Sequence, residues 1–380
     1  MIKGLSLFAN VGVAETYLKD VGVDIVVANE LLEERASFYQ HLYPSCTMIQ
    51  GDIKESCVYK NVIKKSKELN VEFIIATPPC QGMSYAGHKD PNDFRNSLIT
   101  YVFDAIQDLN PKYVLIENVV PQLKTPVTYD GKTMLIPDMI ELLFSDKYYI
   151  NKNHVLNVET LGVPQCRKRA LFLLVDKSLD KTWEIPKGDG SIVTLEDAIG
   201  DLPSLDPPIK EQGYTEKIFP KYEEKKLRGL AVSKWHVARQ HVWRNVEVMM
   251  HTPTGKSAKE NPVYYPKNKD GKMVGGSCCA YKRMDWNKPA PTVTTYNHTI
   301  SSFHNVHPGK MDPETGLYSD ARVLTVFELM RVTTLPDDWD IPDWASENLI
   351  RQVIGEGIPP LAIKKVVAEL AILGGERKND

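Results

Sequence analysis

The first 178 residues alternate between short apolar, β-branched runs and segments in which apolar residues recur every third or fourth position. The short runs predict buried strands, and the periodic segments predict helices. We expect strands at 5–8, 24–28, 73–76, 113–116 and 170–175, and helices at 14–19, 31–42 and 98–109. Such alternation predicts a doubly wound α/β fold, with a mostly parallel sheet covered by helices on both faces.

Polar residues gather where the expected strands end, which is where sheets of this kind bind ligands. A turn at 8–13 follows the first strand, Glu30 ends the second, and Asp52 follows a Gly residue further on. Glu30 stands about 20 residues after the turn, a spacing at which a carboxylate can accept hydrogen bonds from ribose hydroxyls. Each acid alone also fits a strand-end carboxylate that faces water. Together they predict an adenosyl pocket.

The strand at 73–76 runs into a rigid turn in which Cys80 follows Pro78 and Pro79. Two prolines fix φ and remove two backbone donors, so the cysteine leaves the strand in a defined direction. Cys80 alone fits a small buried residue as well as a presented nucleophile. The polar stretch at 85–96 is typical of a loop that closes over a substrate.

Two further strand ends carry charged residues. Glu117 and Asn118 follow the strand at 113–116, within plausible reach of Cys80. Arg167 and Arg169 alternate just before the strand at 170–175, so their side chains are expected on one side, toward a phosphate or a base carbonyl. A solvated basic turn is the alternative interpretation of these arginines.

The net charge of −3 is unevenly distributed, because residues 221–288 carry 15 Lys or Arg against 6 Asp or Glu. Aromatic residues are interleaved with these cations, as expected of a surface that contacts phosphates and stacks on bases. They are Trp235, Trp243, Tyr264, Tyr265, Tyr281 and Trp286. The alternative is an ordinary solvated basic surface.

The six cysteines form no CxxC pair and no disulfide-like framework, which indicates a reducing compartment. Adjacent Cys278 and Cys279 lack the spacing of a zinc site with the nearby histidines, so no metal is expected. No signal peptide is recognisable, and no apolar run reaches membrane-spanning length. We therefore expect a cytoplasmic protein without membrane contact.

In their order along the chain, these motifs resemble the motif series of DNA (cytosine-5) methyltransferases of prokaryotic restriction-modification systems. The N-terminal part of the series comprises 8–12, Glu30, 51–52, 78–81, 95–96, 117–119 and the Gln165, Arg167 and Arg169 set. The C-terminal part comprises Arg322, Thr325, Glu328 and Arg331, then 352–360, while 289–295 resembles the most recurrent stretch of the recognition domain. The resemblance covers nearly the whole chain.

The resemblance implies roles for the catalytic residues. The Cys80 thiolate would add to C6 of a flipped-out cytosine, and Glu117 would contact N3 and the exocyclic amine and supply a proton. Glu117 therefore needs a raised pKa, which desolvation provides. Arg169 would bind the cytosine O2, Arg167 would stabilise the thiolate or contact the phosphate backbone, and Asn118 would fix the geometry.

The resemblance also implies S-adenosylmethionine as methyl donor, S-adenosylhomocysteine as product, and no metal. The residues it assigns to the donor are Phe8, Asn10, Val11, Gly12, Glu30, Leu31, Asp52, Ile53, Pro78, Leu98, Gly355 and Glu356. Three residues depart from the family pattern. Asn10 and Val13 replace glycines, and Glu356 replaces an asparagine, placing a carboxylate near that of the donor unless it points away or pairs with the amine.

The implied partner is double-stranded DNA, together with a possible separate cognate endonuclease, and the protein is expected to be a monomer. Residues expected to contact DNA are Gln81, Ser84, Arg95, Arg244, Lys282, Arg283, Thr292 and Asn297. We expect a catalytic domain at 1–180, a smaller loop-rich β or α+β recognition domain at 181–321 with short strands and long loops, and a return to the catalytic domain at 322–380. A tRNA cytosine-5 methyltransferase and a catalytically silent nucleic-acid-binding module are the alternatives.

Overall fold

The computed structural model describes residues 1–79, 97–261, 266, 270–273, 277–301 and 303–371. Within them the main sheet has the strand order β3-β2-β1-β4-β5-β10-β8, with β9 pairing with β10. The strands are β1 (Ile2–Leu7), β2 (Val23–Glu30), β3 (Thr47–Gln50), β4 (Phe73–Ala76), β5 (Tyr113–Asn118), β8 (Tyr148–Ile150), β9 (Val155–Asn157) and β10 (Lys168–Asp176). Strands β1 to β5 are parallel and β10 is antiparallel to β5. The expected mostly parallel α/β fold is confirmed.

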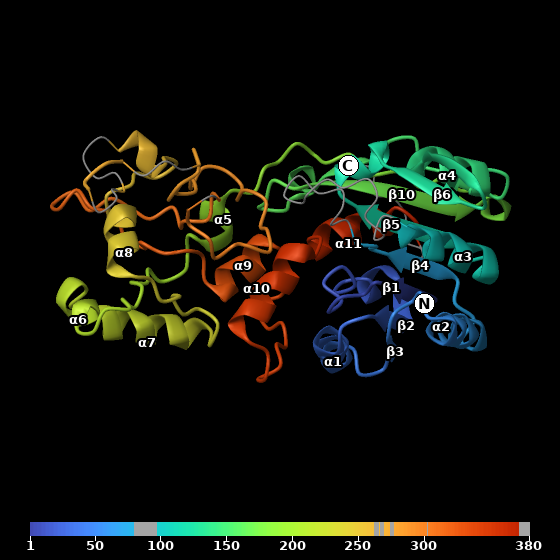
Figure 1. Cartoon of the computed structure of the whole chain (residues 1–380), viewed down its shortest axis with the longest axis horizontal. Helices are drawn as coiled ribbons and strands as arrows, with labels where there is room; N and C mark the ends of the chain where they lie inside the picture. Colours follow the sequence, from blue (N-terminus) through green and yellow to red (C-terminus); the bar gives the residue numbers. More distant parts are fainter. Residues whose placement is uncertain (80–96, 262–265, 267–269, 274–276, 302, 372–380) are drawn as a thin grey trace.

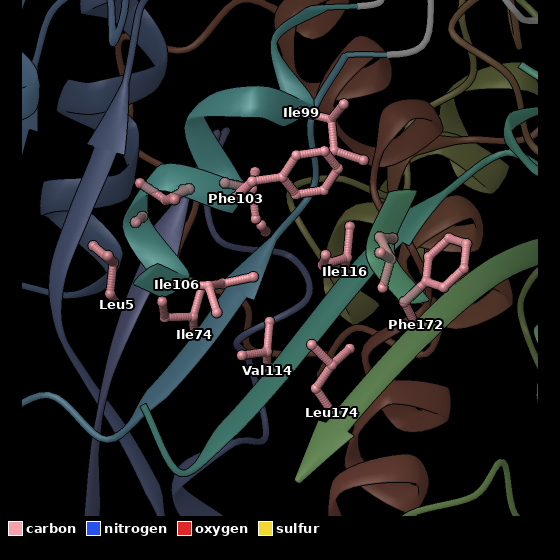
Figure 2. Close-up of a cluster of buried hydrophobic side chains, with 14 of the residues drawn as sticks. Leu5, Ile74, Ile99, Phe103, Ile106, Val114, Ile116, Phe172 and Leu174 are labelled. Carbon is pink, nitrogen blue, oxygen red and sulfur yellow. The ribbon is translucent and has the colours of Figure 1, made fainter. Parts of the chain in front are cut away.

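Apolar clusters cover both faces of this sheet. On one face, α3 (Ile99–Leu109) directs Phe103 and Ile106 toward the strands (Figure 2). Residues of α2 (Ser56–Glu68) and α4 (Ile136–Phe144) belong to the same cluster. On the other face lies α11 (Pro360–Ala368), and the Trp183 indole N–H donates to the Val366 carbonyl at 2.7 Å. Helix α1 (Glu33–Leu42) contributes Tyr39 to this second cluster. Residues from both ends of the chain therefore share one core.

Most expected elements are present, but the helix expected at 14–19 is wrong. The chain makes turns there, with hydrogen bonds such as Leu18 N to Glu15 O that span three residues, and then a 3-10 helix at Lys19–Val21. Three-residue spacing leaves this segment too tightly wound for an α-helix. Strand β3 and helix α2 were not anticipated, because the charged residues of 54–68 obscure a narrow apolar stripe.

Helices, rather than the expected short strands, lie between the long loops of residues 181–321. They are α5 (Leu195–Ile199), α6 (Tyr214–Ile218), α7 (Tyr222–Val232) and α8 (Trp243–Met250). In the described part of this segment, β pairing is confined to isolated bridges such as Arg283 with Val306. Frequent prolines remove the backbone donors that longer ladders need. A small apolar cluster, including Val246, Met249 and Val306, holds these loops together.

Helices α9 (Val326–Val332) and α10 (Glu347–Glu356) lie between the sheet and the segment that carries α5 to α8 (Figure 1). They share an apolar cluster with Val11 and Val13 from the N-terminal turn. Arg322 anchors the entry to α9, since its buried guanidinium pairs with Asp320 and Glu328, each at 2.7 Å. No helix in the described ranges combines the length and apolar composition required to cross a bilayer.

Candidate active site

The turn that follows β1 is held by hydrogen bonds to the end of β2. Phe8 and Asn10 have left-handed backbones, with φ of 58° and 51°, and the Asn10 N–H donates to Glu30 Oε2 at 2.9 Å. The other oxygen of Glu30 accepts from Leu32 N at 3.0 Å. Asparagine tolerates this conformation better than most residues, so Asn10 can replace glycine here.

Gly12 in the same turn is required on two grounds. Its φ is 81°, and an added Cβ would lie 2.3 Å from Cε2 of Tyr43. The Tyr43 hydroxyl also donates to the Gly12 carbonyl at 2.6 Å. The tyrosine ring therefore packs directly beneath the turn.

The ends of β4 and β5 are joined by Asn118. Its Nδ2 donates to the Pro78 carbonyl at 3.0 Å, and its Oδ1 accepts from Val119 N at 2.8 Å. The proline turn is thus fixed against the strand that carries Glu117. The predicted nucleophile Cys80 and the predicted DNA contacts Gln81, Ser84 and Arg95 lie outside the described residues.

Glu117 and Arg169 form an ion pair at the end of the sheet. Leu171 in β10 is opposite Glu117 in β5, so Arg169, two residues earlier, projects from the same face. The distance from Arg169 Nε to Glu117 Oε1 is 2.8 Å, with side chains only 13% and 10% exposed. Burial raises the pKa of Glu117 above its usual range, and Arg169 and Arg167 oppose this rise only in part. The direction agrees with the role expected of a proton donor.

Arg167 occupies a buried position that excludes the expected phosphate contact. Its side chain is 2% exposed. The guanidinium donates to the carbonyl of Val293 at 2.8 Å, of Gly355 at 3.1 Å and of Glu356 at 3.0 Å. These bonds join β10 to the 289–295 loop and to α10, so the phosphate-contact prediction is corrected to a structural role. The predicted contact with the Cys80 thiolate stays a prediction.

The residues assigned to the methyl donor differ in how accessible their side chains are. Leu31, next to Glu30, is 53% exposed, as expected of an apolar side chain that packs against an adenine ring only when the ligand is bound. Asn10 Oδ1 is buried with no hydrogen-bond partner among the described residues. Both observations fit an adenosyl ligand at this edge. In contrast, Val11, Ile53 and Leu98 have buried side chains that belong to the apolar core.

Asp52, Gly355 and Glu356 already have protein contacts. Asp52 accepts from Lys54 N at 3.0 Å and pairs with its Nζ at 3.2 Å. A Cβ on Gly355 would lie 2.3 Å from the Thr294 carbonyl oxygen, so close helix–loop packing accounts for this glycine. The carboxylate of Glu356 pairs with Arg35 at 2.9 Å. A donor contact of these residues stays a prediction.

Two predicted DNA contacts are wrong because their side chains are buried and bonded to backbone carbonyls. Arg283 is fully buried and donates to the carbonyls of Met249 at 2.8 Å and His307 at 2.7 Å. Asn297 Nδ2 donates to the carbonyls of Thr294 and Arg351, both at 2.8 Å. Neither side chain has a donor directed at solvent, and both organise loops instead.

The other predicted DNA contacts in the described residues remain accessible. Arg244 is exposed on α8, and Lys282 is half-buried. Thr292 is exposed, with its hydroxyl donating to the Cys166 carbonyl at 2.6 Å. Thr292 thus lies next to the start of β10 and its arginines.

Sequence reasoning missed a buried acid behind the N-terminal turn. Burial raises the pKa of Glu15 to about 7, and Ser6 Oγ donates to its carboxyl group at 2.5 Å. The segment was expected to be a helix, so no pattern indicated that Glu15 points inward. No group of at least three His, Cys, Asp or Glu side chains suited to a metal ion occurs in the described part of the chain.

Comparison with known proteins settles the family. The model of the C-5 cytosine-specific DNA methylase family matches residues 2–371. The chain belongs to this family. This methylase is 45% identical over 374 residues to Type II methyltransferase M1.HgaI of Avibacterium volantium. The aligned residues cover 97% of this chain and 98% of the relative. It is 29% identical over 217 residues to a tRNA (cytosine(38)-C(5))-methyltransferase of Spodoptera frugiperda, covering 55% and 59% of the two chains.

Solved structures support the fold of the methylase. An E. coli prophage protein described as a DNA modification methyltransferase superimposes with a TM-score of 0.67 at 20% identity, covering 99% of this chain and all of the other. Spodoptera frugiperda DNMT2 gives a TM-score of 0.58 at 17% identity, with the same 99% coverage of this chain. The architecture is therefore shared over the whole length.

Substituting Gly12 tests the packing beneath the turn. We expect Gly12→Ala to lower the free energy of unfolding by about 3 kcal/mol or more, because left-handed strain adds to the clash with Tyr43. Gly131→Ala is the matched control, since φ there is 73° but no atom lies within 4 Å of an added Cβ. The control should lose only about 1 kcal/mol. Equal losses in urea unfolding would contradict the packing argument.

Substitutions of Arg283 and Arg244 should have different effects, because the first arginine is structural and the second is predicted to contact DNA. Arg283→Ala leaves several buried carbonyls without donors, so we expect a loss of about 3 kcal/mol or more in unfolding free energy. Arg244→Ala should change stability by less than about 0.5 kcal/mol but weaken DNA binding and lower its salt dependence. Urea titration and fluorescence anisotropy with duplex DNA measure the two effects. Unchanged DNA affinity of Arg244→Ala would remove this residue from the interface.

Proposed function

We propose that this chain transfers a methyl group to C5 of a specific cytosine in double-stranded DNA, as the modification enzyme of a restriction-modification system. The observation that carries the proposal is the buried Glu117–Arg169 ion pair at the strand ends next to the Pro78 turn. The 45% identity to a Type II methyltransferase extends over nearly the whole of both chains, whereas the tRNA enzyme matches 217 residues. DNA is therefore favoured over tRNA as substrate.

The cytosine ring is too poor a nucleophile at C5 to react directly. In the proposed mechanism the Cys80 thiolate forms a bond to C6, and Glu117 in its acid form donates a proton toward N3, so that the electron pair of the C5–C6 bond becomes available at C5. C5 then forms its new bond to the methyl carbon as that carbon's bond to the donor's sulfonium sulfur breaks, which leaves S-adenosylhomocysteine. The C5 proton is lost to solvent, the proton at N3 returns to Glu117, and cleavage of the bond between C6 and Cys80 regenerates the thiolate and leaves 5-methylcytosine.

Arg169 has two tasks in this scheme. Its Nε holds the Glu117 carboxyl group in place, and its guanidinium would bind the cytosine O2. Because the reacting atoms are inaccessible within a duplex, the base must leave the helix and enter this buried edge. A water-poor pocket strengthens each of these electrostatic contacts.

S-adenosylmethionine supplies the methyl group as an electrophilic sulfonium when it is bound. The turn at 8–12, Glu30 and the exposed Leu31 would hold its nucleoside at the carboxyl ends of β1 and β2. Residues 181–321 would recognise DNA, while 1–180 and 322–380 would form the catalytic domain. A separate endonuclease as functional partner, a monomeric state and a cytoplasmic location complete the proposal.

A methyl-transfer assay tests the proposal. The protein is incubated with labelled S-adenosylmethionine and mixed duplex DNA, and the methylated positions are mapped; we expect 5-methylcytosine at one sequence. With 5-fluorocytosine at that site, the wild type should form a stable covalent adduct, because fluorine cannot leave as a proton does. Label on adenine, label on tRNA alone, or an adduct with Cys80→Ser would contradict the mechanism.

The pH dependence of turnover tests the part played by Arg169. Burial raises the pKa of Glu117, and Arg169 opposes that rise. Arg169→Gln should therefore raise the pKa of Glu117 further, so the acid form persists to higher pH. The alkaline limb of the plot of kcat against pH should then move to higher pH. Turnover at the optimum should also fall, because a contact to the base is lost. Arg331→Gln, which alters ion pairs with Asp201 and Asp337 away from this site, is the control, and an alkaline limb that does not shift in Arg169→Gln would refute the coupling.

A further inference from the structure

The strand order reverses at β1, which has β2 on one side and β4 on the other. In open α/β sheets, ligands bind in the crevice beyond the carboxyl ends of the two strands at such a reversal. The turn containing Asn10 and the Thr77–Pro78 segment follow these two strands. Thr77 Oγ1 donates to the Phe8 carbonyl at 3.0 Å, which places both segments side by side at this edge of the sheet.

A network of four polar side chains lies beside the turn that follows β1. Asn10 Nδ2 donates to Glu356 Oε2 at 2.8 Å, and Gln352 Nε2 donates to Oε1 at 3.0 Å. Arg35 Nη2 lies 2.9 Å from Oε2 and 3.0 Å from Oε1 of the same carboxylate. The ion pair is largely covered, with Arg35 and Glu356 side chains 16% and 23% exposed. It therefore links α1 and α10 to the turn.

A bare carboxylate at this place would oppose part of the expected ligand. The amino-acid end of S-adenosylmethionine carries its own carboxylate, and two like charges about 6 Å apart repel by about 1 to 3 kcal/mol at the effective dielectric of a protein edge. Arg35 neutralises the charge of Glu356, and Asn10 fixes one oxygen of the Glu356 carboxylate by a hydrogen bond. The carboxylate becomes an acceptor within a neutral network.

We propose that Arg35 is a positioning residue that makes this edge of the sheet compatible with the carboxylate at the amino-acid end of an adenosyl ligand, by neutralising and orienting Glu356. The inference rests on the proposed function for the identity of the ligand. The short connection between Glu30 and α1 supports it, because it fixes Arg35 in the first turn of that helix, close to the turn that contains Asn10. Nothing in the sequence pattern of 31–42 had indicated this residue.

Two ligands that differ only at the amino-acid end distinguish repulsion of the ligand carboxylate from a general loss of structure at the site. S-adenosylhomocysteine carries the carboxylate and the amine, whereas 5′-methylthioadenosine lacks both. Titration calorimetry with purified full-length protein should show that Arg35→Ala binds S-adenosylhomocysteine roughly tenfold more weakly, the effect of one uncompensated charge. Affinity for 5′-methylthioadenosine should change less than about twofold, because that ligand has no charge to repel.

A second substitution, at Glu356, completes a double-mutant cycle with Arg35→Ala. Arg35→Ala combined with Glu356→Gln removes both charges, so it should restore most of the affinity for S-adenosylhomocysteine. Arg35→Lys should retain most of it. Arg239→Ala is the matched control, because Arg239 pairs with Glu347 at 3.2 Å at the opposite end of α10; this variant should bind both ligands like the wild type.

The outcomes are distinct. Equal weakening of both ligands by Arg35→Ala would show a loss of structure and overturn the inference. A double variant as weak as Arg35→Ala would also overturn it, because Arg35 would then contact the ligand directly rather than act through Glu356. If the wild type binds S-adenosylhomocysteine and the cycle closes, yet no DNA is methylated, the proposed function fails and the role of Arg35 stands.

Discussion

The buried guanidinium of Arg167 is the contact on which the arrangement of the site depends. It donates to carbonyls of Val293, Gly355 and Glu356, which belong to segments 126 to 189 residues further along the chain. A buried cation is costly unless hydrogen bonds compensate it, so these carbonyls have little freedom to move away. Arg169, two residues later in β10, faces Glu117 from a strand whose start is thereby fixed.

A second set of contacts extends this junction. Cys166 N donates to the Ala290 carbonyl at 2.7 Å, and Ala290 N donates to Pro164 O at 2.9 Å. The side chain of Gln165 accepts from Val293 N at 3.1 Å. The 289–295 loop is therefore bonded to the residues that lead into β10, the strand that carries Arg169.

The sequence predicted the sheet and its polar edge well, because local patterns encode them. The run at 73–76 is β4 as the structure has it, and Glu117 and Arg169, each singled out beside a strand, form an ion pair that the sequence did not predict. Distant contacts leave no such pattern. Arg283 and Arg167 are of a residue type common in DNA-binding surfaces, but hydrogen bonds to backbone carbonyls from other segments keep both side chains buried. Arg35 likewise takes its role from Glu356, which is 321 residues away in the sequence.

Helix α11 covers one face of the sheet whose first strand begins at Ile2, and Trp183 is hydrogen-bonded to that helix. During translation, the ribosome releases β1 to β5 long before α10 and α11. The growing chain therefore leaves part of one apolar sheet face uncovered until α11 has been made, and Arg167 lacks two of its carbonyl partners until Gly355 and Glu356 have been made. Long-range closure of this kind slows folding and leaves the nascent chain open to chaperones. It also means that methylation activity can begin only after the last segments of the fold have been made.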